Sequence, residues 1–185
     1  MPLINKKMKT VKFHNKTFEV FITETEIAAI VHSMANQINN SGVKNPLFIA
    51  VLNGSFLFAA DIMRKINITN CEISFIKLSS YLGTKSIGEV NELIGLGQDI
   101  KNRNVVILED IIDTGITLEK IISLLEEEEV ADIKVATLLF KPEAYQKEIE
   151  IDFIGKSIAN DFVVGYGLDY NEIGRNLPHI YKLKE

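Results

Sequence analysis

The sequence predicts an α/β fold, in which a mostly parallel central sheet is flanked by helices. With 185 residues, 46% hydrophobic and 24% charged, the chain can build one compact domain with a full core and needs no disulfide or structural metal. Short apolar runs rich in β-branched residues, such as residues 105–108, suit strands buried on both faces of a parallel sheet. Strands, glycine turns and helices follow one another without a repeat, linker or low-complexity segment, which predicts a single domain over residues 1–185.

The amino-terminal residues predict a hairpin and then an amphipathic helix. Residues 11–13 and 17–22 flank a polar turn and predict a small hairpin at the edge of the fold. Thr23 and Glu26 form a capping-box pattern, and apolar residues follow at helical spacing until residues 40–42 end the helix.

Two strands and a second helix are predicted next. Residues 46–52 form a buried strand, which a glycine turn connects to a helical pattern that reaches Ile66. Residues 71–78 predict another strand. The polar, glycine-bearing segment 79–88 after it is long for a compact domain, and such loops are more often functional than idle, although a surface excursion remains the alternative.

The second half of the chain repeats the order of strand, turn and helix. Residues 105–108 predict a buried strand, and a helix opens near Thr117 with an apolar face that extends to Leu125. The four glutamates 126–129 at its end oppose the helix dipole, so we interpret them as a solvated surface run. The remaining predicted strands are residues 133–140, residues 153–154 and the first part of residues 161–172.

Charge and cysteine content narrow the possible partners. A formal charge of −5 and a pI near 5.3, without a basic stripe, argue against non-specific binding to nucleic acid or to an anionic membrane. The single cysteine, Cys71, has apolar neighbours and is interpreted as a core residue. The acidic charge favours small-molecule partners, and the single cysteine, which cannot form an internal disulfide, indicates a cytoplasmic protein. No apolar run approaches the length of a membrane span, so neither export nor membrane insertion is expected.

The segment around residue 110 is the strongest candidate site. Glu109 and Asp110 directly follow the strand at residues 105–108, and ligands of α/β sheets bind at the carboxyl ends of strands. The turn at residues 113–117 then offers a glycine, two hydroxyls and the first free amides of a helix, a combination that binds phosphate. Because a phosphate there would lie close to carboxylates, a divalent cation or sugar hydroxyls should intervene. Any one of these residues alone would more simply end a strand or cap a helix.

These residues, together with a second motif, resemble the type I phosphoribosyltransferases. The run Glu-Asp-Ile-Ile-Asp-Thr-Gly at residues 109–115 resembles the hypoxanthine-guanine branch of that family. The run Phe-Val-Val-Gly-Tyr-Gly-Leu-Asp-Tyr-Asn-Glu at residues 162–172 is similar to the base-binding region of the same enzymes, although alone it would be an edge strand and its turn. The resemblance implies the family's fold, with a small hood over the active site formed by N-terminal and C-terminal segments.

For the donor substrate, 5-phosphoribosyl-1-pyrophosphate (PRPP), the resemblance implies three groups of residues. In the first group, Glu109 and Asp110 bind the ribose hydroxyls and lie around the Mg²⁺ site. The residues implied in binding the 5′-phosphate are Asp113, Thr114, Gly115, Ile116 and Thr117. The residues implied in binding pyrophosphate are Asn53, Gly54 and Arg175, with a cis peptide bond between Leu52 and Asn53. Many relatives have lysine where this chain has Asn53, which leaves the backbone of that turn as its anion-binding group, and the turn alone could be a mere connector.

For the acceptor, the resemblance implies a 6-oxopurine site. Lys141 donates to the exocyclic oxygen, Phe162 stacks on the purine, and Val163 contacts its edge, although a lysine after a strand is by itself more often a surface residue. Asp169 is implied as a magnesium ligand beside the purine. The other implied residues are Asp113 as the general base for N7, and Ser80 and Tyr81 in a flexible loop that closes over the site.

The implied reaction is purine salvage: hypoxanthine or guanine and PRPP give IMP or GMP and pyrophosphate, with Mg²⁺ as cofactor. The family implies a homodimer or homotetramer. An aspartyl phosphatase is disfavoured because it needs two aspartates separated by one residue, whereas Asp110 and Asp113 are three positions apart. A nucleotide kinase or ATPase is disfavoured because the sequence has no P-loop motif. An RNA-binding regulator with the same fold is the alternative that remains, and the acidic charge balance opposes it.

Overall fold

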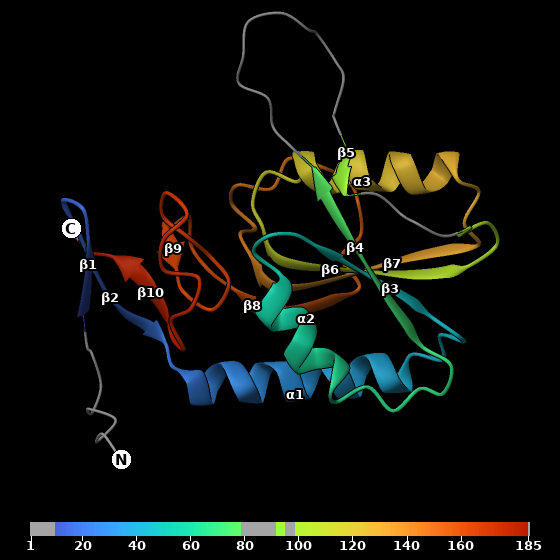
Figure 1. The fold of residues 1–185 in the computed structure, drawn as a ribbon, viewed down its shortest axis with the longest axis horizontal. Helices are drawn as coiled ribbons and strands as arrows, with labels where there is room; N and C mark the ends of the chain where they lie inside the picture. The colour runs from blue at the N-terminus through green and yellow to red at the C-terminus, as the bar shows by residue number, and fades with distance from the viewer. Residues whose placement is uncertain (1–9, 79–91, 95–98, 185) are drawn as a thin grey trace, which may run out of the picture.

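The computed structural model describes residues 10–78, 92–94 and 99–184 and contains two sheets (Figure 1). The larger sheet has six strands in the order β5-β4-β3-β6-β7-β8. All of them except the edge strand β5 are parallel to one another. Their bounds are β3 Leu47–Val51, β4 Glu72–Leu78, β5 Glu92–Ile94, β6 Asn104–Ile112, β7 Asp132–Phe140 and β8 Phe153–Ser157. Helices α1 (Glu24–Asn40) and α2 (Phe56–Met63) cover one face of this sheet, and α3 (Ile116–Glu127) covers the other. The predicted α/β class is confirmed.

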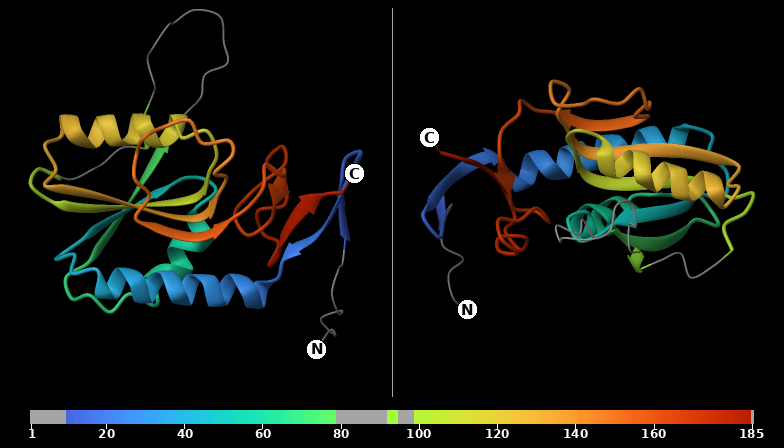
Figure 2. Two further views of the ribbon diagram at one scale, coloured as in Figure 1. Left: turned by 180° about the vertical axis from the view of Figure 1, so that it is seen from behind. Right: turned by 90° about the horizontal axis from the view of Figure 1, so that it is seen from above.

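A four-stranded antiparallel sheet lies beside the large sheet and combines the two ends of the described chain (Figure 2). Its order is β1-β2-β10-β9, with bounds β1 Thr10–Phe13, β2 Lys16–Ile22, β9 Val163–Val164 and β10 Ile180–Leu183. The predicted amino-terminal hairpin therefore forms, as β1 and β2. It completes the small sheet that the family resemblance implied as a hood.

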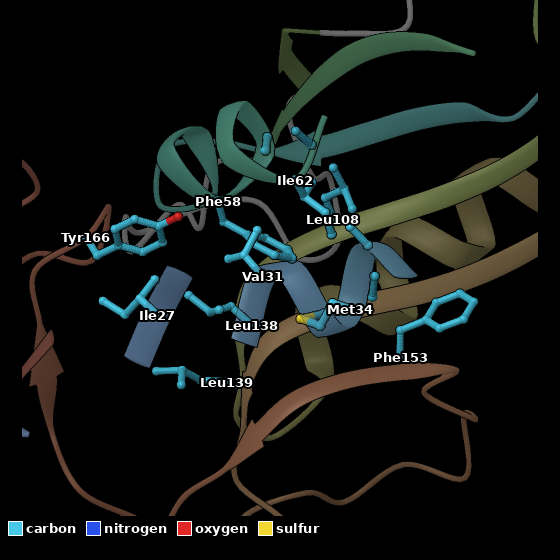
Figure 3. Packing of buried hydrophobic residues seen from close by; sticks show 14 of the residues in the cluster. Ile27, Val31, Met34, Phe58, Ile62, Leu108, Leu138, Leu139, Phe153 and Tyr166 are labelled. Carbon is cyan, nitrogen blue, oxygen red and sulfur yellow. The ribbon is translucent and has the colours of Figure 1, made fainter. Parts of the chain in front are cut away.

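Two apolar layers hold the helices on the sheet. Between the sheet and α1 and α2, residues such as Val31, Phe58 and Leu108 are fully buried (Figure 3). Between the sheet and α3, the core contains alternate residues of the same strands, for example Ile49 and Ile107. Apolar side chains on both faces of β3 and β6 explain why these strands appear in the sequence as unbroken apolar runs.

The local signal for the start of α1 is confirmed, whereas the predicted end of α2 is not. The capping box of α1 is present, since the amide of Glu26 donates to Thr23 Oγ1 at 3.3 Å and the amide of Thr23 donates to Glu26 Oε2 at 2.8 Å. Helix α2 ends at Met63 and does not reach Ile66 as expected. None of the helices in the described part of the chain is long and apolar enough to cross a membrane.

Two other expectations need correction. Strand β6 continues through Glu109 and Asp110 to Ile112, because its ladder with β7 continues to Phe140. Cys71 is half-buried at the border of the core and is not one of its fully buried residues.

Candidate active site

The turn after β6 encloses a cavity of about 100 Å³. Its lining residues are Glu109, Ile111, Ile112, Asp113, Thr114, Gly115, Thr117 and Leu118. Gly115 is the N-cap of α3 with φ +83°, and the amide of Glu119 makes the first helical hydrogen bond, to Gly115 O at 3.0 Å. The amides of the first helical turn therefore have no helical carbonyl partner and can bind an anion. A side chain at position 115 would also be obstructed, since a Cβ would lie 2.5 Å from Tyr145 Cε2.

The two adjacent acids of β6 lie in different surroundings. Glu109 lines the cavity and is only 5% exposed. Burial, with a further contribution from the charge of Asp110, raises the pKa of Glu109 well above its usual range. Asp110 instead lies against Gly54 in the turn after β3. The contact is so close that a Cβ added to Gly54 would lie 1.8 Å from Asp110 Oδ2. One strand thus presents a carboxyl group to each of the two turns that are expected to bind anions.

The pKa of Asp110 is raised to about 6. Burial is the main cause, and the negative charge of Asp169 adds to it. Hydrogen bonds from the amides of Asp110 and Ile111 and the positive charge of Arg175 oppose the increase. Because burial outweighs these opposing contributions, an additional cation near the carboxylate would stabilise it.

The Asn53-Gly54 turn has the backbone geometry that the resemblance implied. The peptide bond between Leu52 and Asn53 is cis, and Ser55 Oγ donates to Val51 O at 2.6 Å. Gly54 is closely covered on its other side, since a Cβ at Gly167 would lie 1.9 Å from Gly54 O. The turn is therefore held between Asp110 and the carboxy-terminal segment.

Arg175 and Asp169 pair with each other on that carboxy-terminal segment. Arg175 Nη2 lies 2.8 Å from Asp169 Oδ1 and 3.1 Å from Glu172 Oε2, while Nη1 donates to Gly167 O at 3.0 Å. Asp169 Oδ2 also accepts from the amide of Glu172 at 2.7 Å. The structure therefore brings Arg175 and Asp169 close to Asp110 and the Gly54 turn, although these come from distant parts of the sequence.

Lys141 is buried and lies next to Asp113. Its Nζ is 2.9 Å from Asp113 Oδ2 and 3.4 Å from Asn160 Oδ1, and the residue is only 7% exposed. The interpretation of Lys141 as an ordinary surface lysine is therefore wrong. Asp113 keeps 46% of its side chain exposed, so it is open to solvent while it contacts both the cavity and Lys141.

Phe162, directly before β9, presents its ring to solvent. The residue is 45% exposed, and its ring contacts Tyr170 edge-on at a centroid distance of 5.8 Å and Phe18 at 6.2 Å. Val163 is buried in β9 and pairs with Lys182 of β10. An exposed, well-supported aromatic ring can stack on a planar ligand.

The sequence did not predict two contacts made by the residues that are expected to bind the purine. Asn160 accepts the hydrogen bond from Lys141, and Lys16 Nζ lies 5.6 Å from the centroid of the Phe162 ring. Asn160 stands just before the aromatic motif, which is the one signal that could have indicated it. Ser80 and Tyr81 lie outside the described residues.

Comparison with known proteins agrees with this geometry. The family model of the phosphoribosyl transferase domain matches residues 22–171. A hypoxanthine-guanine phosphoribosyltransferase of Staphylococcus aureus is 42% identical over 173 residues, which cover 92% of this chain and 96% of the relative, and one of Staphylococcus epidermidis is 43% identical over the same coverage.

Solved structures give the same result. A hypoxanthine phosphoribosyltransferase from Staphylococcus aureus superposes with a TM-score of 0.82 at 41% identity, covering 90% of this chain and 91% of that one. A mutant hypoxanthine phosphoribosyltransferase from Trypanosoma cruzi, in a ternary complex with its substrates, gives 0.81 at 33% identity, covering 94% and 97%. The chain therefore belongs to the phosphoribosyltransferase family, within the group of the hypoxanthine-guanine phosphoribosyltransferases.

Proposed function

We propose that this protein transfers the phosphoribosyl group of PRPP to hypoxanthine or guanine, forming IMP or GMP and pyrophosphate. The observation that carries the proposal is the position of Asp113, which lines the anion-binding cavity and pairs with the buried Lys141 at 2.9 Å. A group that joins a phosphate site to a purine site is what this transfer requires. The 42% identity to the hypoxanthine-guanine phosphoribosyltransferase of Staphylococcus aureus supports the choice of reaction.

The cavity after β6 binds the 5′-phosphate and one side of the ribose. The free amides at the start of α3 and the hydroxyls of Thr114 and Thr117 donate to the phosphate. Glu109 lies at the inner side of the same cavity and hydrogen-bonds a ribose hydroxyl. Fixing the sugar in this way supplies the orientation that a group transfer needs.

Pyrophosphate binds on the opposite face of β6. The backbone of the Asn53-Gly54 turn receives the two phosphate groups together with Arg175, which donates to the O of Gly167 next to Gly54. Arg175 exchanges its contact with Asp169 for the pyrophosphate, since a guanidinium binds phosphate oxygens in the same forked geometry as carboxylate. Pyrophosphate can then leave without disturbing the phosphate cavity.

The carboxylates Asp110 and Asp169 suit a magnesium ion. Mg²⁺ usually takes one or two protein carboxylates and completes its coordination with water and substrate phosphates. No group of three or more acidic, histidine or cysteine residues in the described ranges could hold a metal without such a partner, so the fit is to a metal that arrives with PRPP. When bound, the ion neutralises charge on the departing pyrophosphate.

Asp113 and Lys141 select and activate the purine. Lys141 Nζ donates to the 6-oxo group, which favours hypoxanthine and guanine because the amino group of adenine offers no acceptor there. Asp113 accepts the proton from N7 of the purine as the bond between the purine and the ribose forms. Phe162 stacks on the ring, and stacking of a base on an aromatic side chain is worth about 1 to 3 kcal/mol.

An absorbance assay with PRPP, Mg²⁺ and each purine tests this proposal. We expect turnover with hypoxanthine or guanine and none with adenine. Absence of turnover with every 6-oxopurine would overturn the assignment. We also propose one domain over residues 1–185 that acts as a homodimer or homotetramer in the cytoplasm, and light scattering of the purified protein measures the oligomeric state.

A further inference from the structure

Tyr166 connects the carboxy-terminal segment to helix α2. Its hydroxyl donates to Asp61 Oδ2 at 2.6 Å, although the two residues are 105 positions apart. Figure 3 shows the Tyr166 hydroxyl directed towards α2, beside Phe58. The tyrosine is 6% exposed, and burial together with the Asp61 carboxylate raises its pKa, so the hydroxyl remains a donor at neutral pH.

The backbone at Tyr166 is part of the turn that covers the Asn53-Gly54 turn. Tyr166 has φ +49°, and its neighbours Gly165 and Gly167 have φ +99° and +98°. Glycine adopts a positive φ readily, but at tyrosine it is unfavourable unless tertiary contacts fix it. Gly167, next to Tyr166, rests on Gly54 O so closely that no side chain fits between them.

The same turn holds Arg175. The amide of Gly167 donates to Arg175 O at 2.8 Å, and Arg175 Nη1 donates back to Gly167 O at 3.0 Å. Arg175 in turn pairs with Asp169 at 2.8 Å. The position of the turn therefore sets the position of both charged groups.

Asp61 belongs to the element that carries the pyrophosphate turn. It lies in α2, which begins at Phe56, directly after Asn53-Gly54-Ser55. The hydrogen bond between Tyr166 and Asp61 thus links the two walls of the expected pyrophosphate site at a point outside the site.

We propose that Tyr166 and Asp61 are a positioning pair that keeps Arg175 and Asp169 at the correct distance from the Gly54 turn, and so sets the affinity for PRPP and pyrophosphate. This inference rests on the proposed function. Neither side chain needs to touch the substrate.

The purine residues have separate anchors. The strand pair β9 and β10 holds Val163 opposite Lys182, and the amide of Leu183 donates to Phe162 O at 2.9 Å. The Phe162 ring also packs on Tyr170 and Phe18. Loss of the Tyr166 hydroxyl should therefore leave purine binding nearly unchanged.

Tyr166→Phe, measured in steady-state kinetics and in calorimetric titration with Mg·PRPP and with Mg·pyrophosphate, tests the pair. A hydrogen bond to a charged group contributes enough that we expect the KM for PRPP and the Kd for pyrophosphate to rise about tenfold. The KM for guanine should stay within about twofold of the wild-type value. The melting temperature is a control for folding, and the partly exposed Asp61 carboxylate remains solvated and paired with Arg64 in this variant.

Three changes on α2 complete the design. Asp61→Ala should repeat the effect of Tyr166→Phe, and the double variant should be no worse than either single one. Asp61→Asn keeps an oxygen acceptor and should restore most of the affinity. Arg64→Ala removes the ion pair with Asp61 but leaves the hydrogen bond to Tyr166, so it is the matched control and should bind PRPP normally.

An unchanged affinity for PRPP and pyrophosphate in Tyr166→Phe, or an equal loss for guanine, would overturn the inference. If Tyr166→Phe does not fold, Asp61→Ala provides the same test with the tyrosine ring in place. The titrations do not depend on the acceptor, so a wild-type protein that binds PRPP but converts no 6-oxopurine would refute the proposed function and still test the pair.

Discussion

Replacement of Asp110 by asparagine should stabilise the free protein at neutral pH while weakening its binding of PRPP. Asparagine has nearly the same shape and keeps one oxygen for the amides of Asp110 and Ile111. It also fits against Gly54, where the aspartate already packs without space to spare. The change therefore removes mainly a charge that is partly buried in the absence of ligand.

The magnitude follows from the pKa of Asp110, which is about 6 in the folded protein against an ordinary value of 3.8. An acid whose pKa is raised by folding holds its proton more tightly in the folded state, so the free energy of unfolding falls as the pH rises between these two values. The difference of about two pH units corresponds to about 3 kcal/mol. Asp110→Asn removes this loss, and it also removes one of the causes that raise the pKa of Glu109.

Urea unfolding of both proteins across the pH range measures this effect. Asp110→Asn should gain little at about pH 4 and up to about 3 kcal/mol at about pH 8, relative to wild type. Titration with Mg·PRPP should show weaker binding in the variant at the higher pH. A variant that is less stable than wild type at about pH 8, or a stability difference that does not change with pH, would refute the reasoning.

Further predictions concern the chemistry and the packing of the site. Asp113→Asn should lower kcat by about a hundredfold or more with little change in the Kd of PRPP, and wild-type turnover would exclude Asp113 as the base. Lys141→Ala should raise the KM for guanine by about tenfold and weaken discrimination against adenine, whereas unchanged kinetics with guanine would contradict its role. Gly54→Ala should weaken binding of pyrophosphate, measured by calorimetry, because its methyl group would displace the Asp110 carboxylate. Removal of Mg²⁺ with a chelator should abolish turnover in the absorbance assay, and added Mg²⁺ should restore it.

The sequence predicted those parts of the candidate site that a single continuous stretch of the chain forms. The cavity after β6 is built from consecutive residues, so Asp113, Gly115 and Thr117 could be recognised from the local pattern of an apolar strand, acids and a glycine turn. The end of β6 was predicted four residues too early. Acidic residues usually end a strand, but here the ladder with β7 carries the strand through both acids to Ile112.

The parts that depend on long-range contacts could not be predicted. Nothing in the residues around Lys141 indicates that it is buried, because its partners Asp113 and Asn160 come from two other segments. The hydrogen bond between Tyr166 and Asp61 is equally invisible, since it depends on how the carboxy-terminal turn packs on α2. In both cases the polar group is buried only because a distant residue satisfies it.

In the proposed function the two acids of β6 act on different halves of the substrate, although they are neighbours in the sequence. Glu109 faces the cavity proposed for the 5′-phosphate, and Asp110 faces the Gly54 turn where pyrophosphate would bind. Side chains alternate across a strand, so a pair of adjacent acids places one carboxyl group on each side of the sheet. Because β6 continues as a strand through both residues, the sugar can be held between two rigid anion sites while the bond between ribose and pyrophosphate breaks. This arrangement requires the strand itself, and an acidic loop at the same position would not keep the two carboxyl groups apart.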